Sequence, residues 1–309
     1  MTYSPRLGRI GAAVAVLGLA SALAACSSDD PTAPSDEVAS GETIVVGSFA
    51  FPESEILGEI YAQALEAADF DVETKFNIGP RQQTIPALQD GSINLIPEYN
   101  GNLLAFYNVD YTERTTEDVD AALVDAVAVD ELQVLDSAAA EDKDAYVVTR
   151  ATAEANGLTA IGDLSALEPF KLGANPQFGE LGYGIPGLDS VYGVTDVEFV
   201  PIEDFGGPDT VKALVDDSVQ VADIYTTSPA IVTDDLVVLE DPESMISSQN
   251  VVPLLSDAVY SDELADVLNA ISAALTTEDL IALRDRVEGD EKASAATAAE
   301  DWLKDNGLL

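Results

Sequence analysis

The chain has 309 residues, of which 57 are acidic and 13 basic, so its formal net charge at pH 7 is −44. A surface of this charge repels nucleic-acid phosphate, which excludes nucleic acid as a partner, and its self-repulsion favours a monomer. The chain has no histidine and one cysteine, which excludes Ser-His-Asp and Cys-His catalysis, the H-E-x-x-H zinc motif, thiolate zinc sites and an internal disulfide.

The first residues resemble the signal peptide of a bacterial lipoprotein. Two arginines precede an almost wholly apolar run, residues 10–22, and the segment LAAC ends at Cys26. The 16 residues between Arg9 and Cys26 are too few for a membrane-spanning helix, which needs about 20. We therefore expect residues 1–25 to be removed and Cys26 to be lipidated, which would anchor the protein on the extracytoplasmic face of a bacterial membrane.

Strands and helices alternate after a tether. Residues 26–41 are small, polar and proline-containing, as in flexible linkers. Apolar periodicity then predicts a strand at 43–47, a helix at 55–68, a strand at 72–78, a helix at 82–89 and a strand at 93–96. This order is typical of βαβ units in a parallel sheet.

A second α/β series and a helical tail follow. The second series comprises a helix at 117–129, strands at 132–135, 145–149, 171–174 and 197–201, a helix at 210–215, and strands at 219–224 and 236–239. Three helices are expected at 262–275, 277–287 and 293–303, with Ser261 as N-cap of the first and either Thr276 or Thr277 as N-cap of the second. Two such series predict two lobes. Ligands of open α/β sheets bind beyond the carboxyl ends of strands, so residues 48–52 and 97–102 are pocket candidates.

Seven short motifs follow one another in a fixed order. They are GSFAFPES at 47–54, ILG at 56–58, ALQDG at 87–91, PEYNG at 97–101, PGL with YG at 186–193, DIYTT at 223–227 and DLVVLED at 235–241. Together they resemble the glycine betaine, choline and proline-betaine binding proteins of osmoprotectant ABC importers. This resemblance implies an α/β, type II periplasmic-binding-protein fold with two lobes, two crossover strands and a ligand cleft between the lobes. Lobe 1 would comprise 42–143 and 250–309, and lobe 2 would comprise 144–249.

The resemblance also implies an aromatic cage. A quaternary ammonium donates no N–H hydrogen bond, so aromatic faces hold it by cation-π attraction, about 0.5–2 kcal/mol per contact. Tyr99, Tyr146 and Tyr225 lie where the family has cage members. Any one tyrosine is otherwise more often a half-buried core residue. Asn102 would contact a ligand hydroxyl or serve as a helix N-cap, and Glu98 would have a structural role at a strand end.

Four positions depart from the family pattern. Phe49 stands in place of a lysine, Ser54 of a glutamine and Gln249 of a fourth cage tyrosine. The arginine that would pair with a betaine carboxylate is either replaced by Leu181 or displaced in the sequence. Because the chain has few basic residues, choline or another cation without a carboxylate fits this pattern better than glycine betaine. The remaining ligand-contact candidates are Phe49, Ser54 and Gln249, with Phe51 and Phe178 as further rings.

The sequence thus predicts a solute-binding lipoprotein that delivers a small cationic or zwitterionic organic solute to an ABC permease, without catalytic residues, metal or cofactor. Three alternatives stay open: a binding protein of the same fold for another small organic solute, a sensory or adhesive lipoprotein, and a glycosidase that uses a carboxylate pair. The 57 acidic residues would supply such pairs by chance, so their number alone does not favour an enzyme.

Overall fold

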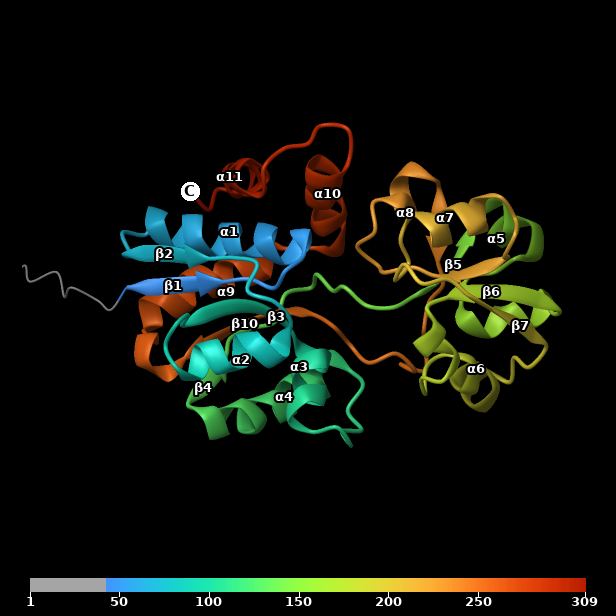
Figure 1. The fold of residues 1–309 in the computed structure, drawn as a ribbon, viewed down its shortest axis with the longest axis horizontal. Coiled ribbons are helices and arrows are strands. Elements are labelled where there is room, and N and C mark those ends of the chain that lie inside the picture. Colours follow the sequence, from blue (N-terminus) through green and yellow to red (C-terminus); the bar gives the residue numbers. More distant parts are fainter. Residues whose placement is uncertain (1–42) are drawn as a thin grey trace, which may run out of the picture. The chain divides into compact units, whose positions relative to one another are not determined.

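Short runs rich in valine, isoleucine and leucine form two five-stranded sheets with helices around them (Figure 1). The computed structural model describes residues 43–309; the expected signal peptide, the tether and Cys26 lie outside this range. Among these residues, none of the helices combines the length and apolar character that crossing a membrane requires.

The first sheet has the strand order β2-β1-β3-β10-β4. Its strands are β1 (Ile44–Gly47), β2 (Val72–Lys75), β3 (Leu95–Tyr99), β4 (Leu132–Val134) and β10 (Val251–Ser256). β1 pairs in parallel with β2 and β3, as the βαβ pattern predicts, whereas β10 is antiparallel to β3 and β4. The chain therefore returns to the first sheet after completing the second.

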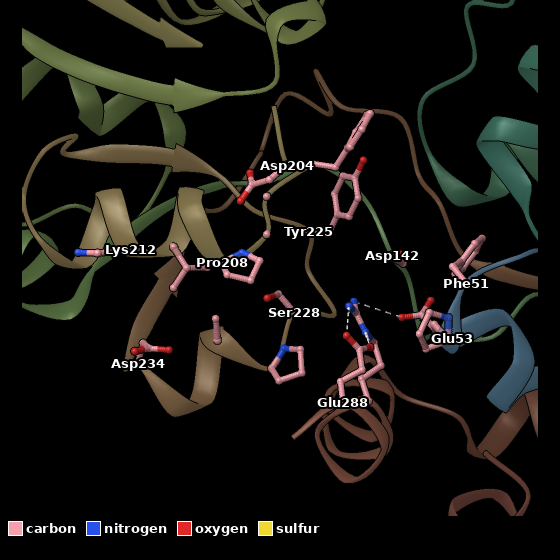
Figure 2. A pocket seen from close by; sticks show the side chains of 18 of the residues that line it. Phe51, Glu53, Asp142, Asp204, Pro208, Lys212, Tyr225, Ser228, Asp234 and Glu288 are labelled. Atoms are coloured by element: carbon pink, nitrogen blue, oxygen red, sulfur yellow. Dashed lines mark hydrogen bonds and ion pairs between the residues drawn. The ribbon is translucent and has the colours of Figure 1, made fainter. Parts of the chain in front are cut away.

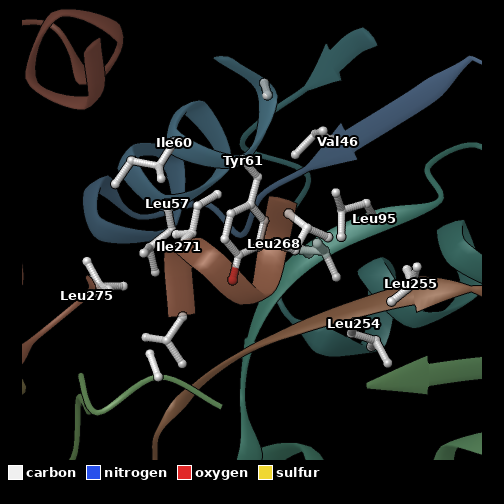
Figure 3. Close-up of a cluster of buried hydrophobic side chains, with 14 of the residues drawn as sticks. Val46, Leu57, Ile60, Tyr61, Leu95, Leu254, Leu255, Leu268, Ile271 and Leu275 are labelled. Atoms are coloured by element: carbon white, nitrogen blue, oxygen red, sulfur yellow. The ribbon is translucent and has the colours of Figure 1, made fainter. Parts of the chain in front are cut away.

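Within residues 43–309, seven helices surround this sheet. They are α1 (Pro52–Ala67), α2 (Arg81–Gln89), α3 (Asn100–Tyr107), α4 (Thr116–Val127), α9 (Asp262–Ala274), α10 (Thr277–Glu288) and α11 (Ala295–Asp305). α1 contacts α9, α10 and α11. Its apolar side chains recur at helical spacing and pack with Leu268 and Ile271 of α9 around the fully buried Tyr61 ring (Figure 3).

Two expected helix starts are confirmed by their caps. The Ser261 hydroxyl accepts a hydrogen bond from the Leu264 amide at 3.1 Å. Thr276 and Asp279 form a reciprocal capping box, in which the Asp279 carboxylate accepts from the Thr276 amide at 2.9 Å. The second cap fixes the start of α10, whose residue Arg284 reaches the larger of the two cavities described below.

The second sheet has the order β7-β6-β8-β5-β9. Its strands are β5 (Tyr146–Thr149), β6 (Phe170–Ala174), β7 (Val197–Pro201), β8 (Val221–Asp223) and β9 (Leu236–Val238), and its helices are α5 (Arg150–Asn156), α6 (Ile185–Tyr192), α7 (Pro208–Val215) and α8 (Ala230–Thr233). Successive residues of β5 belong to two different hydrophobic clusters, so both faces of this sheet are covered.

Two crossover segments, 135–145 and 239–250, connect the sheets. Glu141 of the first and Asn250 of the second form an isolated antiparallel bridge. The Asn250 amide nitrogen donates to the carbonyl of Ala138 at 2.8 Å, which ties the two segments together. The residues of the candidate site lie at or beside these crossovers. The lobe bounds given above stay a prediction.

Candidate ligand-binding site

Two cavities share the side chains Phe51, Asp142 and Tyr225. The smaller has a volume of about 330 Å³ and the larger about 990 Å³ (Figure 2 shows the larger). Both are lined by residues that follow strands of the first sheet and by residues that follow β8 of the second. This position agrees with the rule that ligands of α/β sheets bind beyond strand ends.

Three stacked aromatic rings line the smaller cavity. The ring centroids of Phe49 and Phe51 are 5.7 Å apart and the two rings are nearly parallel, while those of Phe51 and Tyr99 are 6.2 Å apart. Phe49 and Tyr99 are buried, but Phe51 is 39% exposed, so part of this side chain is accessible to a ligand. Tyr225, which is half-buried, lines the same cavity from the other side of the crossover.

Glu53, in the first turn of α1, lies directly behind this wall. Its Oε1 accepts a hydrogen bond from the Tyr99 hydroxyl at 2.6 Å, whereas its Oε2 is buried without a hydrogen-bond partner. Burial away from water, and then the charge of Asp142, raise the pKa of the Glu53 carboxyl to about 8. This raised pKa favours the protonated form of the Glu53 carboxyl at neutral pH.

Arg284 of α10 reaches the same place. Its Nη1 forms an ion pair with Glu53 Oε2 at 3.8 Å, which is beyond hydrogen-bond distance (Figure 2). The same nitrogen donates a hydrogen bond to the Thr227 hydroxyl at 2.9 Å. Its Nε donates to Glu288 at 2.8 Å. Arg284 is thus engaged mainly by Thr227 and Glu288, so it compensates the Glu53 carboxylate only in part.

Three more carboxyl groups gather around the first crossover. Asp142 accepts from the Thr227 hydroxyl at 2.8 Å, and Asp144 accepts from the Tyr183 hydroxyl at 3.1 Å. Asp223, at the end of β8, is buried and its Oδ1 lacks a partner. Burial raises the pKa of all three carboxyls. We call Glu53, Asp142, Asp144 and Asp223 the carboxylate cluster.

Most of the ligand-contact candidates meet at the smaller cavity, which is lined by Phe49, Tyr99, Asn102, Tyr225 and Gln249. Gln249 also has a structural contact, because its Oε1 accepts from the backbone amide of Asn102 at 2.9 Å. Asn102 is exposed and lies in the first turn of α3, whose N-cap is Tyr99, so the alternative of an Asn102 N-cap is wrong.

Ser54 and Tyr146 line neither of these two cavities. The Ser54 hydroxyl is fully buried and accepts from the Phe49 amide at 2.9 Å, so it fixes the segment that carries Phe49. Tyr146 is fully buried, packs edge-on against Phe178 and donates its hydroxyl proton to the carbonyl of Tyr183 at 2.8 Å. In this arrangement backbone and core contacts surround both side chains, and their contact with a ligand stays a prediction.

The cations at the site correct another expectation. Arg81 and Lys143 line the smaller cavity, and Lys212 and Arg284 line the larger one. The site thus has more cationic side chains than the low content of basic residues predicts. Each is paired with a carboxylate: Lys143 lies 2.8 Å from Glu141, and Arg81 lies 2.6 Å from Glu98. Leu181, the candidate replacement for the family arginine, is 36% exposed and lines neither cavity.

Sequence reasoning missed Glu53, Arg81, Arg284 and the first-crossover aspartates. Arg81 holds both oxygens of buried Glu98 and lies over the Phe49 ring at 5.4 Å from its centroid. The structural role expected for Glu98 agrees with this pairing. Within residues 43–309, no group of three or more histidine, cysteine, aspartate or glutamate side chains is arranged to hold a metal ion.

Gly101 allows the second crossover to pass close to α3. A Cβ at this position would lie 2.2 Å from the Ser248 carbonyl oxygen and 2.7 Å from Gln249 Nε2. We expect Gly101→Ala to lower the free energy of unfolding by about 1–3 kcal/mol and to weaken ligand binding, because the backbone beside Gln249 must move. Urea denaturation measures the first effect. Gly182→Ala, which meets no atom within 4 Å, is the matched control, and equal stabilities of the two variants would contradict the expectation.

The chain is similar to solute-binding proteins along most of its length. A family model described as the substrate binding domain of ABC-type glycine betaine transport systems matches residues 42–305. The glycine betaine-binding protein YehZ of Escherichia coli (strain K12) is 26% identical over 278 residues, which cover 85% of this chain and 90% of that protein.

Solved structures agree in fold. Apo YehZ from the same organism has a TM-score of 0.74 at 26% identity, covering 87% of this chain and 100% of that one. A crystal structure of a glycine betaine/carnitine/choline ABC transporter has a TM-score of 0.79 at 21% identity, covering 87% and 99%. These likenesses confirm the two-lobed type II periplasmic-binding-protein fold. The chain therefore belongs to the family of substrate-binding domains of ABC-type glycine betaine transport systems.

Proposed function

We propose that this protein is the lipid-anchored solute-binding component of an ABC importer, and that it captures a small quaternary ammonium solute of the choline or betaine type. The observation that carries this proposal is the wall of stacked rings, Phe49, Phe51 and Tyr99, which faces a cavity of about 330 Å³ also lined by Tyr225 and two aspartates. The membership in a glycine betaine-binding family supports it.

The chemistry of the cavity suits a cation without N–H groups. A trimethylammonium offers only weakly polar C–H groups, which fit against ring faces, and each desolvated cation-π contact contributes about 0.5–2 kcal/mol. Asp142 and Asp144 line the same cavity and add a negative potential. A volume of about 330 Å³ lies within the range of small-molecule pockets.

Choline suits this arrangement better than glycine betaine. A betaine carboxylate needs an available cation, yet Arg81 and Lys143 at the smaller cavity are both engaged by glutamates. It would also meet the negative charges of Asp142 and Asp144, and like charges placed together in a binding site cost several kcal/mol. We therefore expect choline to bind more tightly than glycine betaine.

The proposed function also includes a lipid anchor at Cys26 and closure of the two lobes on the ligand. Lipidation of Cys26 would hold the protein beside the permease through the tether 26–41, which raises its local concentration there. Lobe 1 would comprise 42–143 with 250–309, and lobe 2 144–249. Ligand contacts from both lobes would favour a closed state, which is a shift of population between two conformations.

Tyr225→Ala is expected to weaken choline binding by about 1–2 kcal/mol, because the variant loses one ring face and its burial against the cation. The melting temperature should change little, since Tyr225 is half-buried and its hydroxyl has no hydrogen bond to another described side chain. Isothermal titration calorimetry and a thermal melt measure the two effects. A collapse of the melting temperature would instead assign Tyr225 to the core.

A calorimetric screen of choline, glycine betaine, carnitine and polyamines tests the proposed function. We expect saturable binding of choline with one site per chain. Failure of all these solutes to bind a folded sample would overturn the proposal, and tighter binding of a polyamine would favour the alternative of another organic solute.

One observation bears on the glycosidase alternative: Glu53 has a raised pKa beside a second carboxyl, which glycoside hydrolysis requires. However, Glu53 is 2% exposed, and one of its oxygens accepts from Tyr99 while the other is enclosed. Glycoside hydrolysis needs a carboxyl oxygen in contact with the glycosidic bond. The site therefore fits binding better than hydrolysis.

A further inference from the structure

The carboxylate cluster is not balanced by positive charge. Arg284, the cation beside Glu53, is shared with Glu288, and Lys143 is paired with Glu141. Three of the four carboxyl groups accept hydrogen bonds from hydroxyl groups, which carry no charge. The positive charge of Arg284, which is shared with Glu288, therefore balances only part of the negative charge of the cluster. A cluster of this kind must take up protons or another cation, because uncompensated buried charge is costly.

Two oxygen atoms show where compensation is missing. Glu53 Oε2 and Asp223 Oδ1 are buried and have no hydrogen-bond partner within residues 43–309. Each of the two residues is only 2% exposed, so solvent supplies no partner from outside. The other oxygen of Glu53, Oε1, accepts a hydrogen bond from Tyr99, so Oε2 alone lacks a donor in this carboxyl group. An enclosed carboxylate oxygen without a donor is stable when it carries a proton or lies close to a cation.

The groups that face Glu53 come from four elements. Tyr99 at the end of β3 donates to it, Asp142 of the first crossover repels its charge, and Arg284 of α10 attracts it. Thr227, after β8, also lies beside Glu53, but it donates its hydroxyl proton to Asp142. The positive end of the α1 dipole also favours the anion. Burial and Asp142 outweigh these effects and raise the pKa of Glu53 to about 8.

Asp142 is a neighbour of Glu53 and is also in contact with the cavities in which the ligand is proposed to bind. It is partly exposed and lines both cavities, so a cation against the rings of Phe51 and Tyr225 lies on its open side. Its remaining neighbours are Arg284, Thr227 and Asp144, and through Asp144 it adjoins Tyr183 and Asp223. A positive charge within about 4–6 Å lowers carboxyl pKa values by about 1–3 units.

We infer that an organic cation and a proton compete for the Glu53–Asp142 pair, so that capture of the ligand releases a proton to solvent and these two carboxylates supply the counter-charge of the bound cation. The inference rests on the proposed function. No covalent bond changes: the proton on the carboxyl pair leaves as the fixed positive charge arrives.

The sign of the effect follows from the raised pKa. Below about pH 8 the ligand-free pair holds a proton that the cation must displace, so affinity rises with pH. The rise approaches about tenfold per pH unit and levels off once the proton has left in the free protein. Without ligand, the extra proton stabilises the folded state, and this contribution is lost as pH rises toward 8.

Calorimetry in two buffers tests the exchange. Choline and glycine betaine do not titrate near neutral pH, so any proton released on binding comes from the protein. We expect the binding enthalpies in phosphate and in HEPES at pH 7 to differ by the amount that corresponds to about one proton per ligand. We also expect the dissociation constant to fall by about tenfold from pH 6 to pH 7 and to level off above pH 8.

Substitutions at the two carboxyl groups identify the residue that releases the proton. Glu53→Gln should abolish both the release and the pH dependence, while Asp142→Asn, which removes the repelling charge, should reduce the release and serves if Glu53→Gln fails to fold. Asp234→Asn is the matched control: it removes an exposed carboxylate from the larger cavity and should retain both effects. Binding with equal enthalpies in both buffers and a flat pH profile would overturn the exchange and leave the proposed function intact. Failure of both solutes to bind would overturn the proposed function itself.

Discussion

Arg81→Met is expected to lower the free energy of unfolding by about 3–5 kcal/mol, because it leaves a buried carboxylate without its cation. Glu98 is fully buried at the end of β3, and its two oxygens accept from Arg81 Nε at 2.8 Å and Nη2 at 2.6 Å. The remaining partner of Glu98 is the backbone amide of Tyr99 at 3.0 Å. Urea denaturation followed by circular dichroism measures the loss.

A control and a rescue separate this effect from lost packing. Arg150 forms an exposed ion pair with Asp235 at 2.6 Å, and Arg150→Met should cost less than about 1 kcal/mol. Adding Glu98→Gln to Arg81→Met removes the orphaned charge and should restore part of the stability. The account would be contradicted if Arg81→Met were as stable as Arg150→Met. Since Glu98 directly precedes Tyr99, the ion pair also positions a ring of the candidate site.

Tyr146→Ala is expected to lower the free energy of unfolding by about 3–5 kcal/mol, in the range of other buried aromatic truncations. The ring is fully buried in β5, with its centroid 5.4 Å from that of Phe178, and the hydroxyl donates to the Tyr183 carbonyl. The variant would leave a cavity and an unpaired carbonyl. Urea denaturation measures the cost.

Comparison with Tyr225→Ala makes this result informative. The resemblance to the family assigns Tyr146 and Tyr225 the same role, whereas the structure encloses the first and leaves the second at both cavities. We therefore expect Tyr146→Ala to lose stability and Tyr225→Ala to lose affinity. A Tyr146→Ala protein with unchanged stability and at least tenfold weaker choline binding would show that Tyr146 is a cage member.

Local patterns predicted the regular elements well where polar and apolar residues alternate with a clear period. β1, α1, α4 and α9 lie close to their expected bounds, because each buries one face against a neighbouring element. The sequence did not predict α3. Asn100 and Gly101 are typical turn residues, but the Asn100 side-chain oxygen accepts from the Asn250 amide at 2.9 Å, and the close crossover requires a glycine.

α6 was missed for a related reason. Residues 182–187 contain three glycines and a proline, which favour a turn, yet the proline stands in the first turn of α6, where its missing N–H costs nothing. The helix is then stabilised by packing of its buried Leu188, a contact that lies outside the local sequence.

The rings of the site could be predicted from motif position, whereas its charges could not. Phe49, Tyr99 and Tyr225 stand in recognisable motifs, and the fold brings them to one cavity. The carboxylate cluster combines α1, the first crossover and β8. Glu53 and Asp223 stand within two of the quoted motifs, but nothing in the local sequence indicates that these four of the 57 acidic residues come together. Their burial, and thus their raised pKa values, depends on tertiary packing.

An organic cation is expected to bind against the rings of Phe51, Tyr99 and Tyr225, and a crystal structure of the protein with choline would show its position. We expect the quaternary nitrogen within about 6 Å of these ring centroids, with Asp142 beside it. Choline bound at a site remote from these rings, or a cavity that stays empty at saturating choline, would mean that the rings do not form the binding site.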